Sequence, residues 1–199
     1  MEKFEQCETS EIISFAKGEV KIETDADGKP AMLTGYAATF GNKSNDLGGW
    51  KAVISKGAFD NVMSDDVVCV FNHSRDYLLG RTSSGTVSLS LDDVGLKYTV
   101  KLPNTQLGRD MAELVARGDI VGSSFKANVK RGSIKLSKDK EGFEVHTFDA
   151  FENLIDVSPC TIPAFSDTSV EIKMSLEKRK LDQVRMSMNA NRVRLAEIE

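Results

Sequence analysis

The two histidines, His73 and His146, are the residues of this 199-residue sequence whose type suits acid–base chemistry near neutral pH. His73 directly follows the apolar run 67–71, which predicts a buried strand, so a rigid element would hold the imidazole where that strand ends. His146 lies within the alternating segment 143–148, on the face that also carries Glu144. His73 is therefore the better candidate for a general base. A purely structural hydrogen bond is the alternative for each histidine.

The nucleophile of such a site would be a serine, threonine or cysteine, and the best serine context is the segment 117–125. Here a predicted helix ends, a glycine turn reverses the chain, and small residues lead through Ser123 and Ser124 into a strand. The sequence has no GxSxG elbow of the hydrolase type. Cys69 lies between valines and Cys160 follows a proline, so neither is predicted to be a reactive thiol. An ordinary polar strand start is the alternative for the serine segment.

The carboxylates that could orient a histidine are Glu152 and Asp156. Their even spacing places both on one side of a predicted strand, opposite Ile155 and Val157. A carboxylate in such a position either holds an imidazole in the required tautomer or is simply solvated. Both interpretations stay open at this point.

The residue counts speak against a metal site or a disulfide framework. Three cysteines at wide spacings and two histidines do not form the ligand pattern of a zinc site. No carboxylate cluster resembles a calcium or magnesium loop. We therefore expect neither a metal nor a cofactor.

Charge and hydropathy narrow the class of protein further. The sequence holds 26 Lys plus Arg against 30 Asp plus Glu, a net charge of -4, which argues against general nucleic-acid affinity. The lysine-rich stretch 126–140 lacks interleaved aromatic residues and is predicted to be an exposed hairpin. No apolar run approaches the ~18 residues of a membrane span, and the start of the chain lacks the pattern of a signal peptide. We expect a cytoplasmic protein with no membrane partner.

The elements that must position these residues are mostly short strands. Segments 86–91 and 96–102 alternate with period two and predict a β-hairpin. Residues 106–117 predict a helix capped by Thr105, because their apolar positions recur at helical spacing. Further strands are predicted at the segments 13–22, 32–40, 50–54, 67–71, 120–129, 143–148, 154–157 and 170–174, with a helical turn or two at 57–63. The pattern indicates a mainly β architecture, most simply a barrel or a strongly curved sheet.

A series of motifs runs in order between about residues 12 and 173. They are Gly35–Asn42, Asp46–Gly49, Gly57–Phe59, Phe71–His73, Leu79–Thr86, Asp93–Leu96, Leu102–Thr105, Arg117–Phe125, Asp156–Pro159 and Pro163–Phe165. Together they resemble the prohead (capsid maturation) protease family of tailed phages, whose members are similar to the herpesvirus assemblin proteases. Each motif alone is weak, but the ordered series is specific.

The resemblance implies roles for three residues. The histidine of the Asn-His motif, His73, is the general base of the family pattern. The serine directly before phenylalanine in the Gly-Asp-Ile motif is the nucleophile, which is Ser124 rather than Ser123. The third member is Asp156, at a position where the family usually carries glutamate.

Two further residues stay candidates for the third role. Herpesvirus relatives use a second histidine there, which keeps His146 as a candidate, and Glu152 is the other nearby carboxylate. The resemblance also implies a mainly β (α+β) fold, an antiparallel β-barrel of the herpesvirus-protease type with flanking helices.

The resemblance further implies a serine endopeptidase that cleaves segments of the phage scaffold and major capsid proteins, and also itself, inside the assembling prohead in the host cytoplasm. It acts without a cofactor, and a homo-oligomer is possible. Residues 1–175 would form the protease domain and residues 176–199 a charged helical tail that serves as a tether to scaffold or as a site of self-cleavage. The main alternative is a non-catalytic capsid-assembly or scaffold-binding protein of the same fold. A third hypothesis is a nucleic-acid-binding barrel that uses the 126–140 stretch.

Overall fold

In the part of the chain that the structure describes, the protein forms three small β-sheets and one α-helix. The structure is a computed structural model and describes residues 20–24, 30–44 and 46–161. Within these ranges the strands are β1 (Val20–Thr24), β2 (Pro30–Thr39), β3 (Trp50–Ile54), β4 (Val68–Val70), β5 (Leu78–Arg81), β6 (Val87–Leu91), β7 (Gly95–Lys101), β8 (Gly122–Val129), β9 (Ile134–Lys138), β10 (Glu144–Phe148) and β11 (Phe151–Cys160). A short 3-10 helix, η1 (Phe71–His73), follows β4, and α1 (Gln106–Arg117) precedes β8.

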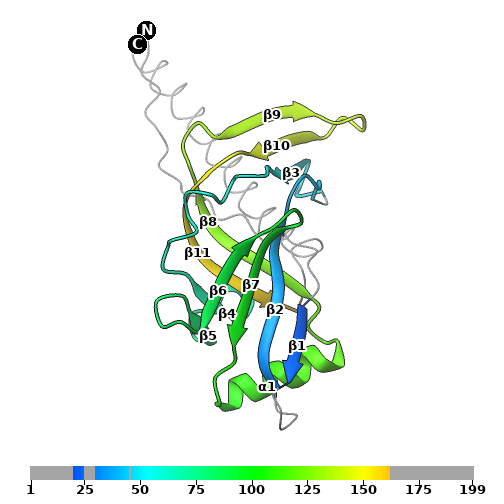
Figure 1. The fold of residues 1–199 in the computed structure, drawn as a ribbon. Coiled ribbons are helices and arrows are strands. Elements are labelled where there is room, and N and C mark those ends of the chain that lie inside the picture. The colour runs from blue at the N-terminus through cyan, green and yellow to red at the C-terminus, as the bar shows by residue number, and fades with distance from the viewer. Residues whose placement is uncertain (1–19, 25–29, 45, 162–199) are drawn as a thin grey trace, which may run out of the picture.

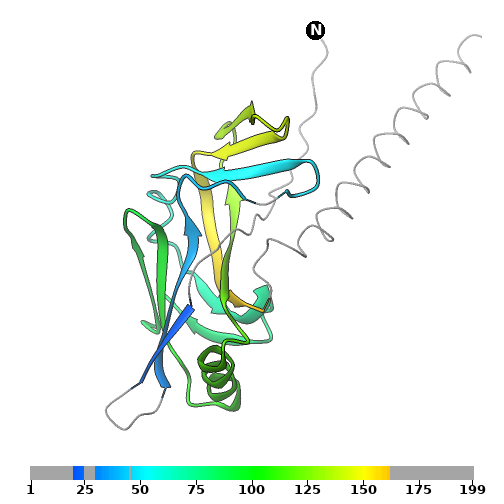
Figure 2. The ribbon, with the colours of Figure 1, turned by 90° about the vertical axis from the view of Figure 1, so that its right-hand side faces the viewer.

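The three sheets pack around a common core. Sheet A has the order β1-β2-β7-β6, sheet B the order β3-β10-β9, and sheet C the order β5-β4-β11-β8. Sheets A and C contact each other through β2 and β8 and through β5 and β7. Figures 1 and 2 show sheet B at one end of the molecule and α1 at the other. The long strands β8 and β11 run between these two ends.

The expectation of a mainly β fold is confirmed, whereas the closed antiparallel barrel is not found. In the part of the chain that the structure describes, strand pairing gives three separate sheets, so closure stays a prediction. The pairing is also not purely antiparallel, because β10 pairs with β3 in parallel and β11 pairs with β4 in parallel. Long stretches of chain separate the partners in both pairs, as parallel pairing requires.

The helix prediction is confirmed at both ends of α1 (Gln106–Arg117). The Thr105 side chain accepts a hydrogen bond from the Gly108 backbone nitrogen at 3.3 Å, which satisfies one of the free amides of the first turn. Gly118 ends the helix in the left-handed conformation with φ 79°, where a residue without Cβ is favoured. The predicted hairpin is confirmed as well, with β6 and β7 antiparallel.

Other elements agree with the sequence prediction only in part. The lysine-rich stretch 126–140, predicted to be an exposed hairpin, is divided between the end of β8 and the exposed strand β9, which pairs with β10 in antiparallel register. The helical turn or two predicted at 57–63 is present as successive turns, closed by hydrogen bonds from Asp60 N to Gly57 O and from Val62 N to Phe59 O. Of the predicted strand 13–22, only residues 20–22 are described, within β1. The predicted strand 170–174 and the tail 176–199 lie outside the described residues. Within the described ranges 20–24, 30–44 and 46–161, no helix is long and apolar enough to cross a membrane.

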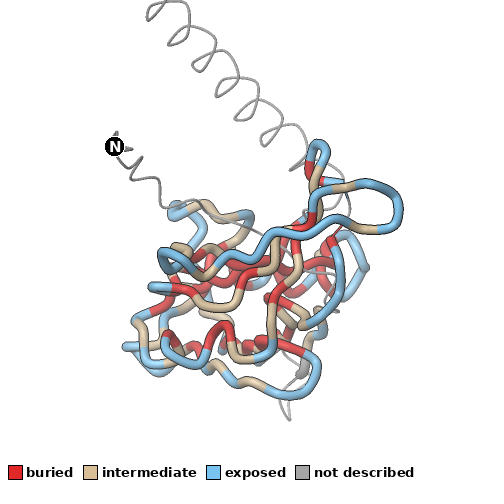
Figure 3. The backbone as a smooth tube through the Cα atoms, turned by 90° about the horizontal axis from the view of Figure 1, so that it is seen from above, coloured by how far each residue is buried: buried red, intermediate tan, exposed pale blue. Residues whose placement is uncertain are grey.

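An aromatic cluster links β8 and β11 to the chain that follows β3. Phe59 is fully buried, with its ring 4.8 Å from that of Phe151 on β11 and 5.0 Å from that of Phe125 on β8. The rings of Phe125 and Phe151 also contact each other edge-on, with centroids 5.4 Å apart. Figure 3 shows the buried residues gathered inside the fold, whereas the outer loops are exposed. Because Phe125 directly follows Ser124, this cluster fixes the strand that carries the candidate nucleophile.

We predict that Phe59→Ala destabilises the fold by about 3–5 kcal/mol, because it removes a fully buried ring and leaves a cavity. Denaturant unfolding followed by circular dichroism measures the change. Leu136→Ala is the matched control, since Leu136 is 63% exposed on β9 and should change the stability by less than about 0.5 kcal/mol. Equal stabilities of the two variants would contradict the assigned core.

Candidate functional site

The alternation of β8 separates the two neighbouring serines. Successive side chains of a strand point to opposite faces, so Ser123 and Ser124 face opposite sides of sheet C. β11 pairs with β8 in antiparallel register, with Ser158 opposite Ser124 and Asp156 opposite Lys126. Directly opposed residues share a face, so Ser124, Asp156 and Ser158 lie on the same side of the sheet.

Ser123 belongs to the core. Its hydroxyl shares a 2.8 Å hydrogen bond with the hydroxyl of Tyr98, and both residues are fully buried. Burial raises the pKa of the Tyr98 hydroxyl, which therefore stays neutral. Gly35 lies so close that a Cβ there would be 2.6 Å from the Ser123 hydroxyl oxygen. The inward serine is thus a structural residue held between sheets A and C.

A strained turn presents His73. After β4 (Val68–Val70) the chain enters η1, in which Asn72 has φ 51° and His73 has φ 56°. This left-handed conformation costs about 1–2 kcal/mol for a residue with a Cβ, and Asn and His are among the residues that adopt it most often. The Asn72 side chain accepts a hydrogen bond from the Thr161 backbone nitrogen at 3.1 Å. The end of β11 therefore helps to hold the turn.

The turn brings His73 between a hydroxyl and a carboxylate. His73 Nε2 lies 2.9 Å from Ser124 Oγ, and His73 Nδ1 lies 2.6 Å from Asp156 Oδ1. With the ring proton on Nδ1, this nitrogen donates to Asp156 and leaves Nε2 to accept the proton of Ser124. The three side chains thus form a hydroxyl–imidazole–carboxylate chain, whose members the sequence prediction named.

Ser158 is a fourth residue of this arrangement that the sequence analysis missed. Its hydroxyl donates to Asp156 Oδ1 at 2.9 Å and accepts from the backbone nitrogen of His73 at 3.3 Å. It also lies 3.2 Å from His73 Nδ1. A signal was present in the sequence, because Ser158 stands two residues after Asp156 and must share its face of a strand.

The expectation that Glu152 and Asp156 share one face of a strand is wrong. Glu152 is exposed, whereas Asp156 is only 4% exposed. Irregularities in the pairing of β11 with β8 occur between Phe151 and Asn153 and between Leu154 and Asp156, and each bulge shifts the alternation. A buried carboxylate needs partners, which here are His73 and Ser158.

His146 lies on a different sheet. It belongs to β10 in sheet B, where its ring stacks on Trp50 with centroids 4.5 Å apart. Its Nε2 lies 3.4 Å from Glu144 Oε2. In the described part of the chain, neither His146 nor Glu152 contacts the His73 ring.

The two described cysteines, Cys69 and Cys160, take no part in the hydrogen bonds that join Ser124, His73 and Asp156. Burial, and then the charge of Asp156, raises the pKa of the Cys69 thiol and raises that of the Cys160 thiol to about 12. Both stay protonated at neutral pH, as expected of thiols without nucleophilic character. Among the described residues, no group of three or more His, Cys, Asp or Glu side chains is arranged to hold a metal ion.

The comparison with protein families finds one match that covers most of the chain. The family model described as caudovirus prohead serine protease matches residues 17–186. Neither the curated proteins nor the solved structures contain a significant match to the chain.

We predict that Ser158→Ala slows the labelling of Ser124 by a fluorophosphonate about 10- to 100-fold, because a hydrogen bond to a charged group contributes about 1.5–3 kcal/mol. The maximal labelling rate should fall, while the reagent concentration that gives half of this rate stays unchanged. Mass spectrometry of the labelled peptide measures the reaction. Ser88→Ala is the control, since Ser88 is an exposed serine on β6. Equal labelling rates in Ser158→Ala and wild type would show that Ser158 does not position His73.

Proposed function

The chain belongs to the family of caudovirus prohead serine proteases, and on this premise we propose that it is an endopeptidase whose nucleophile is Ser124, with His73 as general base and Asp156 as the third catalytic member. The observation that carries this proposal is the pair of short contacts on the two nitrogens of one imidazole, to a serine at 2.9 Å and to a carboxylate at 2.6 Å. Serine hydrolases of unrelated folds use this same arrangement.

The geometry supports a defined sequence of proton movements. His73 Nε2 takes the proton of Ser124 as its oxygen attacks the carbonyl carbon of a peptide bond. The resulting imidazolium is stabilised by the buried Asp156 carboxylate, which also keeps the ring oriented through Nδ1. His73 then gives its proton to the amine that leaves, and water hydrolyses the acyl-enzyme by the reverse sequence.

Aspartate at position 156 fits this role although the family usually carries glutamate there. The shorter side chain reaches His73 because η1 folds back over β11, whose end holds Asn72 through Thr161. The Ser158 hydroxyl donates to the same carboxylate oxygen, so Oδ1 has two donors and is fixed in place.

The family indicates where the enzyme acts. We propose that its substrates are segments of the phage scaffold and major capsid proteins, cleaved inside the assembling prohead in the host cell. We also propose that residues 1–175 form the protease domain, with the barrel architecture of herpesvirus proteases, and that the tail beyond residue 175 is cleaved by the enzyme itself.

One observation favours a second candidate, a non-catalytic assembly protein of the same fold. Ser124 is fully buried, and the side chain of His73 is only 24% exposed. A polypeptide can reach the Ser124 hydroxyl only after the surrounding chain moves. The protease hypothesis therefore requires that the site open when substrate binds.

The two neighbouring serines offer a matched test. Co-expression with the scaffold and capsid proteins should give cleaved products with wild type, whereas Ser124→Ala lowers cleavage by about 10⁴-fold or more. Ser123→Ala should retain cleavage but lose about 1–3 kcal/mol of stability, because the buried Tyr98 hydroxyl loses its partner. Gel analysis of the products and thermal unfolding measure the two effects. Identical uncleaved products from wild type and Ser124→Ala would show that the protein is not a protease.

Self-cleavage has its own signature. Intact mass measurement of wild type after complete scaffold digestion should show loss of residues beyond about position 175. Ser124→Ala, purified in the same way, should keep its full mass. A tail that stays intact in the active enzyme would exclude self-cleavage at this position.

A further inference from the structure

A pocket of about 600 Å³ adjoins the hydroxyl–imidazole–carboxylate chain at Asp156. It is open to solvent and is lined by both apolar and charged side chains. The lining residues are Asp65, Asp66, Val68, Val70, Arg75, Leu78, Arg81, Asn153, Leu154, Ile155 and Asp156. Apart from Asp156, none of them has a role in the proposed catalytic steps.

The register of sheet C places this pocket on the face that carries the candidate nucleophile. A row of directly paired residues crosses the four strands from Lys126 through Asp156 and Val68 to Arg81. Cross-strand partners share a face, and Ser124 stands two residues before Lys126 on β8. The candidate nucleophile and the pocket therefore lie on the same side of sheet C, although Ser124 itself is fully buried.

The distance from Ser124 to the pocket suits an extended peptide. The strands β4 and β5 are two and three positions away from β8 in the sheet, which is roughly 10–14 Å at the usual strand spacing. An extended chain advances about 3.3 Å per residue, so it crosses this distance in about three or four residues. A substrate bound at Ser124 would thus place a residue near its cleaved bond in the pocket.

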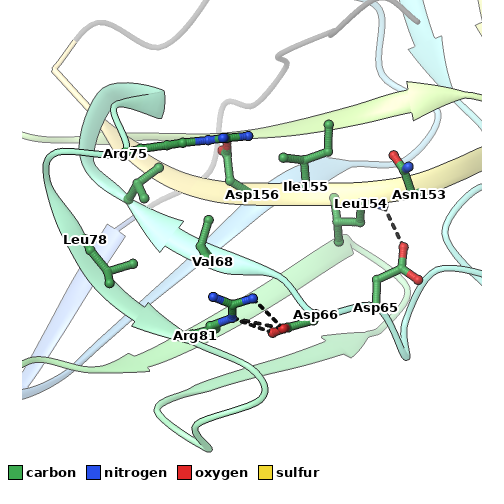
Figure 4. A pocket seen from close by; sticks show the side chains of 11 residues that line it. Asp65, Asp66, Val68, Arg75, Leu78, Arg81, Asn153, Leu154, Ile155 and Asp156 are labelled. Carbon is green, nitrogen blue, oxygen red and sulfur yellow. Dashed lines mark hydrogen bonds and ion pairs between the residues drawn. The ribbon is translucent and has the colours of Figure 1, made fainter.

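The charges of the pocket distinguish its two ends. Arg81 is already engaged, because its guanidinium donates to both carboxylate oxygens of Asp66 at 2.7–2.9 Å, and this contact lowers the pKa of Asp66. Arg75, which follows η1, is exposed and makes no hydrogen bond or ion pair with any residue that the structure describes. Asp65 accepts a hydrogen bond from the Leu154 backbone nitrogen. Figure 4 shows Arg75 and Asp65 at different ends of the pocket, with the side chains of Ile155 and Leu154 between them.

Apolar side chains form the rest of the lining. Leu78 is 50% exposed, and Val68 and Ile155 are partly exposed, although each belongs to a strand of sheet C. Exposed aliphatic surface beside an unpaired guanidinium suits a side chain that has an aliphatic stem and a negative end. A basic side chain at the same place would meet the positive charge of Arg75.

We infer that this pocket is a substrate-recognition subsite that binds a glutamate or aspartate of the cleaved polypeptide through Arg75, about three or four residues from the scissile bond. The inference rests on the proposed function, since it assigns the specificity of that same site. Arg75 is a specificity residue here and takes no part in the chemical step. Because Arg75 lies two residues after His73, the same turn would hold the general base and recognise the substrate.

A library of decapeptides randomised on both sides of a central bond tests the inference, with the products sequenced by mass spectrometry. Wild type should prefer Glu or Asp over Lys by about fivefold at one position two to five residues from the cleaved bond, as expected for an exposed ion pair. Arg75→Gln should abolish this preference, and Arg75→Glu should reverse it. High salt should weaken the preference of wild type.

Lys140→Glu is the matched control for Arg75→Glu, because both substitutions change the net charge by the same amount. Lys140 lies on an exposed turn between β9 and β10. Its preference should equal that of wild type. Circular dichroism and thermal unfolding of the Arg75 variants check that they fold. Active wild type without an acidic preference, or an acidic preference that persists in Arg75→Glu, overturns the subsite and leaves the proposed protease activity intact. Absence of cleavage by wild type, together with absence of a fluorophosphonate label on Ser124, overturns both.

Discussion

The pairing of β11 with β8 is the constraint on which the rest of the site depends. Its register sets Ser158 opposite Ser124 and places Asp156 on the same face. On its other edge β11 pairs with β4, whose end leads into the turn that carries His73. The contacts of His73 consequently join residues that are 51 and 83 positions apart in the chain. A shift of one residue in either pairing would turn the hydroxyl or the carboxylate away from the imidazole.

The two faces of sheet C have different surroundings. One face holds the hydroxyl–imidazole–carboxylate chain and the adjoining pocket. The other face packs against sheet A through the buried contact of Ser123 with Tyr98. Phe125 joins the aromatic cluster on this inner face. Successive residues of β8 point to opposite faces of sheet C. Tight packing of Ser123 and Phe125 in the core therefore also fixes the position of Ser124 on the other face.

Local elements of the fold could be predicted, and non-local ones could not. The helix 106–117 and the hairpin of β6 and β7 follow from spacing and capping within short stretches of chain. The parallel partners of β10 and β11 lie far away in the sequence, and no local pattern encodes such a pairing. The strand β9 was not predicted by itself, although Ile134 and Leu136 alternate with polar residues, because the segment is short and its pairing with β10 is not encoded within it.

By itself the sequence determined which chemistry is possible, because a scarce residue type and a series of ordered motifs singled out His73, Ser124 and Asp156. Only the tertiary structure decided their geometry. The bulges of β11 separate Asp156 from Glu152, and the left-handed turn of Asn72 and His73 aims the imidazole. Ser158 joins the site because it shares the face of β11 that carries Asp156, and the spacing of these two residues was already visible in the sequence. Bulges and strained turns are stabilised by contacts between segments that are distant in the chain. No short stretch of sequence contains the information for such contacts.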